Sequence, residues 1–231
     1  MHDPAVRRPA GTMSRSQEED RLPTDGARTR NKERTREELL TTATEVFAEG
    51  GYSSTTLDEI AERVQTAKRM IYYYFGSKEQ LFIAVLERAY LDLKAAEEAL
   101  DVDDLPPVEA MRTITSFLYD FHDSHPHLLK LVGIENVHQA EHLMKSEILP
   151  TLRTPAIGAI ERVVRRGVAS GDFLESADPL DIHMLISAYC VFHVANRYTF
   201  RALFDRDLRA PAHRDHYRRM IGDVVVRYLA G

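Results

Sequence analysis

The stretch from Thr55 to Lys78 limits the possible folds of this chain more than any other segment, because it carries closely spaced helix signals. Thr56 and Glu59 have the spacing of a capping box, which predicts a helix that begins here. Gln65-Thr66 interrupts the helical pattern, and residues 67–75 restore it. The segment therefore predicts two short helices joined by a tight turn, followed by the start of a third helix.

The second short helix is predicted to carry hydrogen-bond donors along its outer face. Lys68, Arg69, Tyr72 and Tyr73 share this face because they form pairs four residues apart. The face has two cations and two phenols and no carboxylate. The major groove of DNA offers phosphate oxygens and base-edge acceptors to such donors. The pattern favours a surface that binds DNA.

This stretch resembles the DNA-binding head of the TetR (tetracycline repressor) family of bacterial regulators. The resemblance rests on Thr56, Ile60-Ala61, Lys68, Ile71 to Phe75 and Gly76-Ser77-Lys78-Glu79, and it ends at Leu81. A helix-turn-helix alone is a weak signal, whereas the run IYYYFGSKEQL at this distance from TTLDEIAE is a strong one. Gln65 departs from the turn glycine usual in the family, and Ala67 departs from the usual capping residue, a role for which Thr66 is a candidate.

The resemblance and the local chemistry together predict individual DNA contacts. Lys78 lies in the first turn of the next helix, where a cation is normally unfavourable, and a bound phosphate would explain it. Lys68 and Arg69 lie early on the recognition helix and are predicted to contact base edges. The hydroxyls of Thr56 and Tyr73 are predicted to contact phosphates. The full set of candidate DNA-binding residues is Thr56, Thr66, Lys68, Arg69, Tyr72, Tyr73 and Lys78.

Composition narrows the class of protein. The chain has 231 residues, of which 44% are hydrophobic, so it can bury a sizeable core. Its single cysteine, Cys190, excludes an internal disulfide and fits the cytoplasm. No apolar run reaches transmembrane length, so no membrane partner is expected. No Walker, nucleophile-elbow or dinucleotide-binding motif occurs, and we expect neither a cofactor nor an enzyme.

The net charge is −6, and positive charge gathers on the segment from Arg28 to Arg36. Residues 1–33 have almost nothing to bury and are predicted to be disordered. Their basic end is either a solvated tail or an arm that contacts DNA. Thr35 and Glu38 predict the start of a first helix, which would run from about Arg36 to Glu49.

The remaining pattern is helical throughout, so the predicted fold is all-α. A long helix is expected from Ser77 to about Leu100, with a third capping box at Ser77 and Gln80. Residues 34–94 are predicted to form a three-helix DNA-binding head, and residues 95–231 a larger helical body. The segments Leu180–Phe204 and Asp215–Ala230 are rich in apolar residues, and they are the predicted helices of a homodimer interface.

The body is also predicted to hold a small-molecule effector, because the family resemblance implies a pocket there. Aromatic and polar side chains along the body helices are either ordinary core residues or the lining of such a pocket. The candidate effector-pocket residues are Phe117, Phe121, His122, Asn136, Tyr189 and His193, and the same mixture includes His125, His183 and Asn196.

Three hypotheses of different classes follow. The first is a dimeric, ligand-relieved repressor that binds a near-palindromic operator. The second is a metal-dependent hydrolase, because His138, Glu141 and His142 match the H-x-x-E-H pattern of inverted zinc peptidases. The third is an architectural DNA-binding protein without effector control. Bound zinc would favour the second, and binding to random DNA as tight as to any short site would favour the third.

Overall fold

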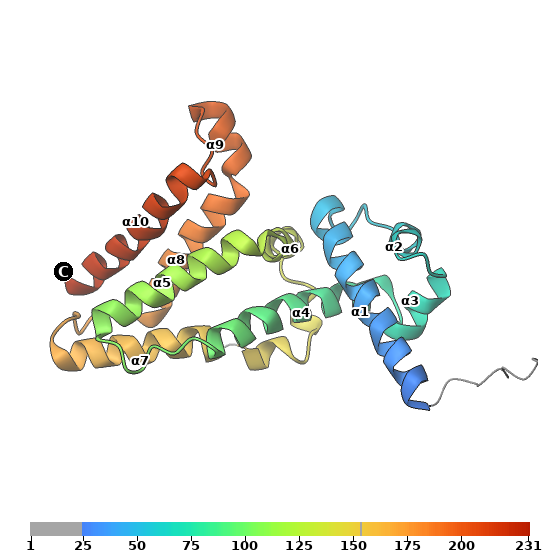
Figure 1. Ribbon diagram of the computed structural model, residues 1–231, viewed down its shortest axis with the longest axis horizontal. Coiled ribbons are helices and arrows are strands. Elements are labelled where there is room, and N and C mark those ends of the chain that lie inside the picture. The colour runs from blue at the N-terminus through green and yellow to red at the C-terminus, as the bar shows by residue number, and fades with distance from the viewer. Residues whose placement is uncertain (1–24, 153) are drawn as a thin grey trace, which may run out of the picture. The chain divides into compact units, whose positions relative to one another are not determined.

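The computed structural model describes residues 25–152 and 154–231, and this part of the chain consists of α-helices, two short 3-10 helices and loops, without a strand (Figure 1). The all-α prediction is confirmed. Residues 36–231 form one compact unit, and residues 25–35 belong to a second unit. Among the described residues, no helix is long and apolar enough to cross a membrane.

Helix α1 runs over Asp25–Gly50 and begins well before the predicted start at Arg36. Thr35, the predicted N-cap, lies inside the helix, where its hydroxyl donates to the carbonyl of Asn31 at 2.9 Å. A threonine can make this i−4 bond within a helix as readily as it can cap one, so the capping pattern was misleading. The predicted disorder of residues 1–33 is wrong over residues 25–33, and residues 1–24 lie outside the described residues.

Two short helices follow, α2 at Leu57–Arg63 and α3 at Lys68–Phe75. The Thr56 hydroxyl accepts from the backbone N–H of Glu59 at 3.2 Å, which confirms the predicted cap of α2. Gln65 has a φ of 55°, the left-handed conformation that favours glycine. Ala67 is the N-cap of α3 and no side chain bonds there, so the capping role predicted for Thr66 is wrong.

Helix α4, at Lys78–Glu98, connects two hydrophobic cores. Its N-cap is Ser77, whose hydroxyl accepts from the N–H of Gln80 at 3.1 Å, as the sequence predicted. In its first half, Leu81, Phe82 and Leu86 are buried in the core of the head, with residues of α1, α2 and α3. Farther along, Leu93 packs against the separate core of the body.

Eight further helical elements follow α4 in the described part of the chain, and most of them belong to the body. They are α5 at Pro107–Ser124, α6 at Pro126–Val137, η1 at Leu143–Lys145, η2 at Leu149–Leu152, α7 at Thr154–Ser170, α8 at Pro179–Ala195, α9 at Arg197–Phe204 and α10 at Pro211–Ala230. Helix α5 packs against α7, α8 and α10, and Figure 1 shows α5 and α10 side by side. The helix predicted over Leu180–Phe204 is two helices, because the chain turns at Asn196.

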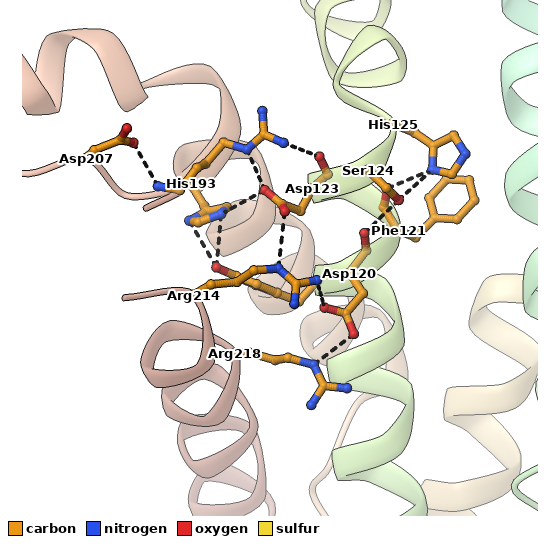
Figure 2. Close-up of polar contacts among 11 residues, drawn as sticks. Asp120, Phe121, Asp123, Ser124, His125, His193, Asp207, Arg214 and Arg218 are labelled. Carbon is orange, nitrogen blue, oxygen red and sulfur yellow. Dashed lines mark hydrogen bonds and ion pairs between the residues drawn. The ribbon is translucent and has the colours of Figure 1, made fainter. Parts of the chain in front are cut away.

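A polar network joins the end of α5 to α10 (Figure 2). Asp123 accepts from Arg209 Nε at 2.5 Å and from Arg214 Nε at 3.4 Å. Asp120 accepts from Arg214 at 2.6 Å and from Arg218 at 2.8 Å. Burial raises the pKa of Asp123, but the adjacent Arg209 guanidinium outweighs it and holds the pKa below its usual value. The network adds charged contacts between α5 and α10 to the apolar packing that the two helices share in the core of the body.

Two glycines of α7 give a stability prediction with an internal control. A Cβ added at Gly167 would lie 2.0 Å from the ring of Phe173, which is buried, whereas one at Gly158 would have its nearest neighbour at 3.8 Å. Gly167→Ala should lower the free energy of unfolding by about 1–3 kcal/mol, because it overpacks the core. Gly158→Ala should raise it by up to about 1 kcal/mol through helix propensity. Thermal denaturation of both variants checks this, and equal shifts would contradict it.

Candidate DNA-binding surface and body cavity

Helix α3 presents the predicted donor face to solvent. Ile71 and Phe75 are buried in the head, whereas Tyr72 is 49% exposed and Tyr73 is 64% exposed. Lys68 and Arg69 are exposed at the start of the same helix, and Thr66 is half-buried in the preceding turn. The helix therefore separates an apolar inner face from an outer face of donors. This arrangement can place cations and phenols against a groove of DNA.

Lys68 is already paired in the protein alone. Its Nζ lies 2.8 Å from the carboxylate of Asp58, and this hydrogen bond raises the pKa of Lys68. A contact between Lys68 and a base would replace this exposed ion pair, which contributes little to stability. The described residues give Arg69 no ion pair, so its guanidinium can reach a partner without that exchange.

Lys78 lies against an aromatic residue that sequence reasoning missed. Its Nζ is 4.7 Å from the centroid of the Tyr52 ring and 3.4 Å from the carbonyl oxygen of Ser53. Burial lowers the pKa of the Lys78 ammonium. Tyr52 follows the glycines that end α1, and nothing in its sequence position indicated this contact. The ring and the carbonyl hold the ammonium at the N-terminus of α4, where an anion is favoured.

Tyr52 also contacts the segment after α6. The ring of His142 lies 4.3 Å from that of Tyr52 and 4.9 Å from that of Phe82. His142 is buried, and its Nδ1 is 2.6 Å from Glu135 Oε1. The other oxygen of Glu135 accepts from the N–H of Leu143 at 3.0 Å. Glu135 of α6 and His142 of the following loop therefore form a buried pair, and its imidazole packs against the Tyr52 ring beside Lys78.

This geometry overturns the hydrolase hypothesis. The predicted zinc motif requires His138 and His142 on one helix, but α6 ends at Val137. Gln139 and Ala140 have positive φ values of 57° and 61°, so the two histidines are not one helical turn apart. Glu141 pairs with Lys145 at 2.8 Å. Across residues 25–152 and 154–231, no group of three metal-binding side chains converges.

The body contains a cavity of about 380 Å³ between α4, α5, α6, α7 and α8. Leucine, valine and isoleucine side chains form much of its wall, and a few polar groups interrupt them. Its lining residues are Tyr90, Leu93, Lys94, Glu97, Leu118, His122, Leu128, Leu129, Val132, Ile157, His183, Ser187 and Val191. Its size and mixed lining are typical of a small-molecule site.

Of the six candidate effector-pocket residues, the structure places only His122 on this wall. Phe117 packs against the body core, and Asn136 is exposed and donates to the carbonyl of Val132 at 2.8 Å. Phe121 lines a different hollow, of about 240 Å³, beside α1. These placements depend on how the helices rotate against one another, which helical periodicity does not specify.

Tyr189 and His193 do not line this cavity, and both make hydrogen bonds elsewhere. The hydroxyl of Tyr189 donates to the carbonyl of Tyr217 at 3.3 Å. Buried His193 lies 3.0 Å from the hydroxyl of Tyr119 and 3.4 Å from Asp123, within the network of Figure 2. His193 therefore belongs to the group that joins α5, α8 and α10.

The cavity residues contributed by α4 were missed. Tyr90, Leu93 and Glu97 are spaced i, i+3 and i+7, so they share one face of the helix. Glu97 could have indicated this site in the sequence, because it shares a face with Tyr90 and Leu93 and a buried carboxylate needs a partner.

Apolar side chains also remain uncovered on the outer faces of α8 and α10. Met184 is 64% exposed and Phe192 50% on α8, and Val224 is 44% and Tyr228 53% on α10. The apolar residues of α10 thus divide between two faces, because Ile221 and Val225 are buried within the protomer while Val224 and Tyr228 face outward. Contiguous exposed apolar surface commonly marks an interface.

Comparisons with known proteins agree with this architecture. Residues 39–85 match the family model described as bacterial regulatory proteins, tetR family, and residues 107–225 match the tetracyclin repressor-like C-terminal domain. The chain is 33% identical over 204 residues to the HTH-type transcriptional repressor NicS of Pseudomonas putida. The aligned residues make up 88% of this chain and 96% of that protein. It is 31% identical over 121 residues to the regulator RutR of Escherichia coli, across 52% of this chain and 57% of that protein.

A solved structure of a tetR-family regulatory protein from Rhodococcus RHA1 has the same fold, with a TM-score of 0.67 and 19% identity over 85% of this chain and 97% of that one. The chain belongs to the TetR family of transcription regulators, which is not a family of enzymes. The resemblance carried by residues 55–81 is confirmed.

Proposed function

We propose that this protein is a repressor that binds a near-palindromic operator as a homodimer and releases it when a small molecule enters the body cavity. The donor face of α3 carries the proposal, because Lys68, Arg69, Tyr72 and Tyr73 lie exposed on one side of a helix anchored by Ile71 and Phe75. Thr56 and Lys78 flank that face and are the proposed phosphate contacts. The proposed site of action is the bacterial cytoplasm, where operator DNA is accessible to a regulator of this family.

The second copy of the chain would cover the apolar faces of α8 and α10. Two-fold pairing of these helices gives a four-helix interface and sets two heads side by side. Such a dimer requires half-sites about one helical turn, roughly 34–36 Å, apart. The same symmetry accounts for a near-palindromic operator.

Effector control would act through α4. Leu93 lines the cavity, Ala96 is half-buried on the next turn, and Leu86 is buried in the core of the head. A ligand that prefers a tilted α4 would therefore move the N-terminus of the helix, and Lys78 with it. Linkage makes the effect reciprocal, with a coupling of about 1–3 kcal/mol in typical cases.

The experiment that tests the function is selection of operator DNA from random sequences by the purified protein. Strong preference for one short near-palindrome over random DNA at equal salt is expected. Equal affinity for all selected and unselected DNA would favour an architectural protein and overturn the proposal.

Two substitutions test how the DNA contacts divide. Lys78→Ala should weaken binding to every sequence alike and reduce the salt slope by about one unit, because it removes a phosphate contact. Arg69→Ala should cost roughly 1–3 kcal/mol and relax preference at one operator position. Fluorescence anisotropy over a salt series measures both. Equal losses on operator and random DNA for both variants would refute the assignment.

A further inference from the structure

The body cavity contains three buried polar atoms that have no hydrogen-bond partner within the described protein. They are Glu97 Oε1 on α4, His122 Nδ1 on α5 and His183 Nδ1 on α8. All three residues line the same cavity, and His122 is only 8% exposed. Buried polar groups in folded proteins are nearly always paired, and an unpaired one is costly. Three such atoms from three helices indicate a ligand that pairs with them.

The two basic side chains around the cavity have acidic partners, whereas Glu97 Oε1 has none among the described residues. Lys94 lies one turn before Glu97, but its Nζ pairs with Glu98 at 3.6 Å. Arg162 of α7 borders the adjoining hollow, and its Nε is 3.2 Å from Asp103. Leu128, Leu129 and Val132 of α6 bring no charge to the wall. The buried oxygen of Glu97 is thus the acidic group that lacks a partner here.

The two imidazoles are uncharged at neutral pH. Burial lowers the pKa of His122 to about 4, with His183 and His125 adding to the effect, and burial also lowers the pKa of His183. They therefore offer neutral donors and acceptors and do not neutralise Glu97. A carboxylate ligand would face the Glu97 carboxylate, and two uncharged imidazoles would not offset the repulsion between the like charges.

We propose that the effector is a compact molecule with an apolar body and a protonated amine, whose N–H groups donate to Glu97 and to an imidazole nitrogen of His122 or His183. Leu93, Leu118 and Ile157 supply an apolar wall for its body. The cavity of about 380 Å³ suits a molecule with one or two rings. This inference rests on the proposed function and specifies the chemical class of the ligand.

The test uses full-length protein and three matched series of probes. Benzylamine, 2-phenylethylamine and tryptamine are each compared with the alcohol and the carboxylate that carry the same ring, by calorimetry at up to millimolar concentration. At least one amine should bind at least about tenfold more tightly than its carboxylate partner. Tighter binding of the carboxylates or alcohols, or no binding by any amine, would overturn the proposal.

Two carboxamide variants identify the group responsible. Glu97→Gln should weaken amine binding by at least about tenfold, because it removes the buried anion and keeps the shape of the side chain. Glu109→Gln is the matched control, since Glu109 is an exposed carboxylate in the first turn of α5 and does not line the cavity. It should leave amine binding within about twofold, as expected for an exposed charge. Equal effects of the two substitutions would place the recognition elsewhere.

The pH dependence provides an independent readout. Burial, with the nearby charge of Glu98, raises the pKa of Glu97 to about 7. The amines remain protonated up to pH 8, so binding that requires ionised Glu97 should strengthen by about tenfold from pH 6 to pH 8. The alcohols should show no such rise, and Glu97→Gln should abolish it. A flat profile for the amines in the unmodified protein would contradict the pairing.

Operator release separates this inference from the proposed function. If alcohols or carboxylates release the operator and amines do not, the amine class is wrong and the repressor assignment stands. If amines bind with the expected dependence on Glu97 but leave operator affinity unchanged, the ligand chemistry stands and ligand relief fails.

Discussion

Val224→Asp is expected to convert the protein into a monomer and to lower its affinity for a two-half-site operator by at least about a hundredfold. Val224 is 44% exposed on the outer face of α10, between Met220 and Tyr228. In the proposed dimer this face is buried, and an unpaired carboxylate there costs several kcal/mol. Because the side chain is uncovered in the protomer, the protomer itself should remain folded. The affinity falls because the two heads are no longer tethered.

Val137→Asp is the matched control for this prediction. Val137 is 80% exposed at the end of α6, beside the loop that carries Gln139 and Met144, and the substitution is chemically identical. Sedimentation velocity should show a monomer for Val224→Asp and a dimer for Val137→Asp, with similar thermal stability for both. An intact dimer in both variants would move the interface to another surface.

Glu135→Ala is expected to lower the free energy of unfolding by about 3–5 kcal/mol, as for other buried pairs that lose one partner. Glu135 is 1% exposed and accepts from both His142 and the N–H of Leu143, so its removal leaves two buried groups without partners. For a chain of this size the midpoint of thermal unfolding should fall by roughly 6–20 °C.

Glu141→Ala serves as the control, because Glu141 is an exposed carboxylate of the same loop paired with Lys145. Its replacement should leave the midpoint of thermal unfolding almost unchanged, because an ion pair exposed to solvent contributes little to stability. Calorimetry on both variants gives the comparison. A loss for Glu135→Ala no larger than that for Glu141→Ala would show that the pair contributes no net stability.

The same pair connects the body to the DNA-binding head. His142 packs on Tyr52, and the Tyr52 ring lies beneath the ammonium of Lys78. Helix α4 is therefore not the sole physical link between the cavity and the proposed phosphate contact. We expect Glu135→Ala to weaken operator binding as well, in a protein kept folded at low temperature.

Local signals in the sequence determined the head. The cap at Thr56, the cap at Ser77 and the separation of donors from apolar residues on α3 each depend on residues within a few positions of one another. Such features are set by helical geometry and by hydrogen bonds between near neighbours. The all-α class followed in the same way, from apolar periodicity repeated along the chain. The start of α1 was the exception. A threonine hydroxyl can donate to the carbonyl four residues earlier inside a helix, as Thr35 does, and it can equally cap the start of one.

Only the tertiary structure decided which side chains line the cavity and which histidines are already paired. His122 and His183 face the cavity without a partner for Nδ1, while His193 bonds to Tyr119 and His142 bonds to Glu135. Periodicity places a residue on a face of its own helix, but it does not specify which helix that face will meet. That choice depends on packing between segments distant in sequence, where the fit of many side chains sets each helix's rotation.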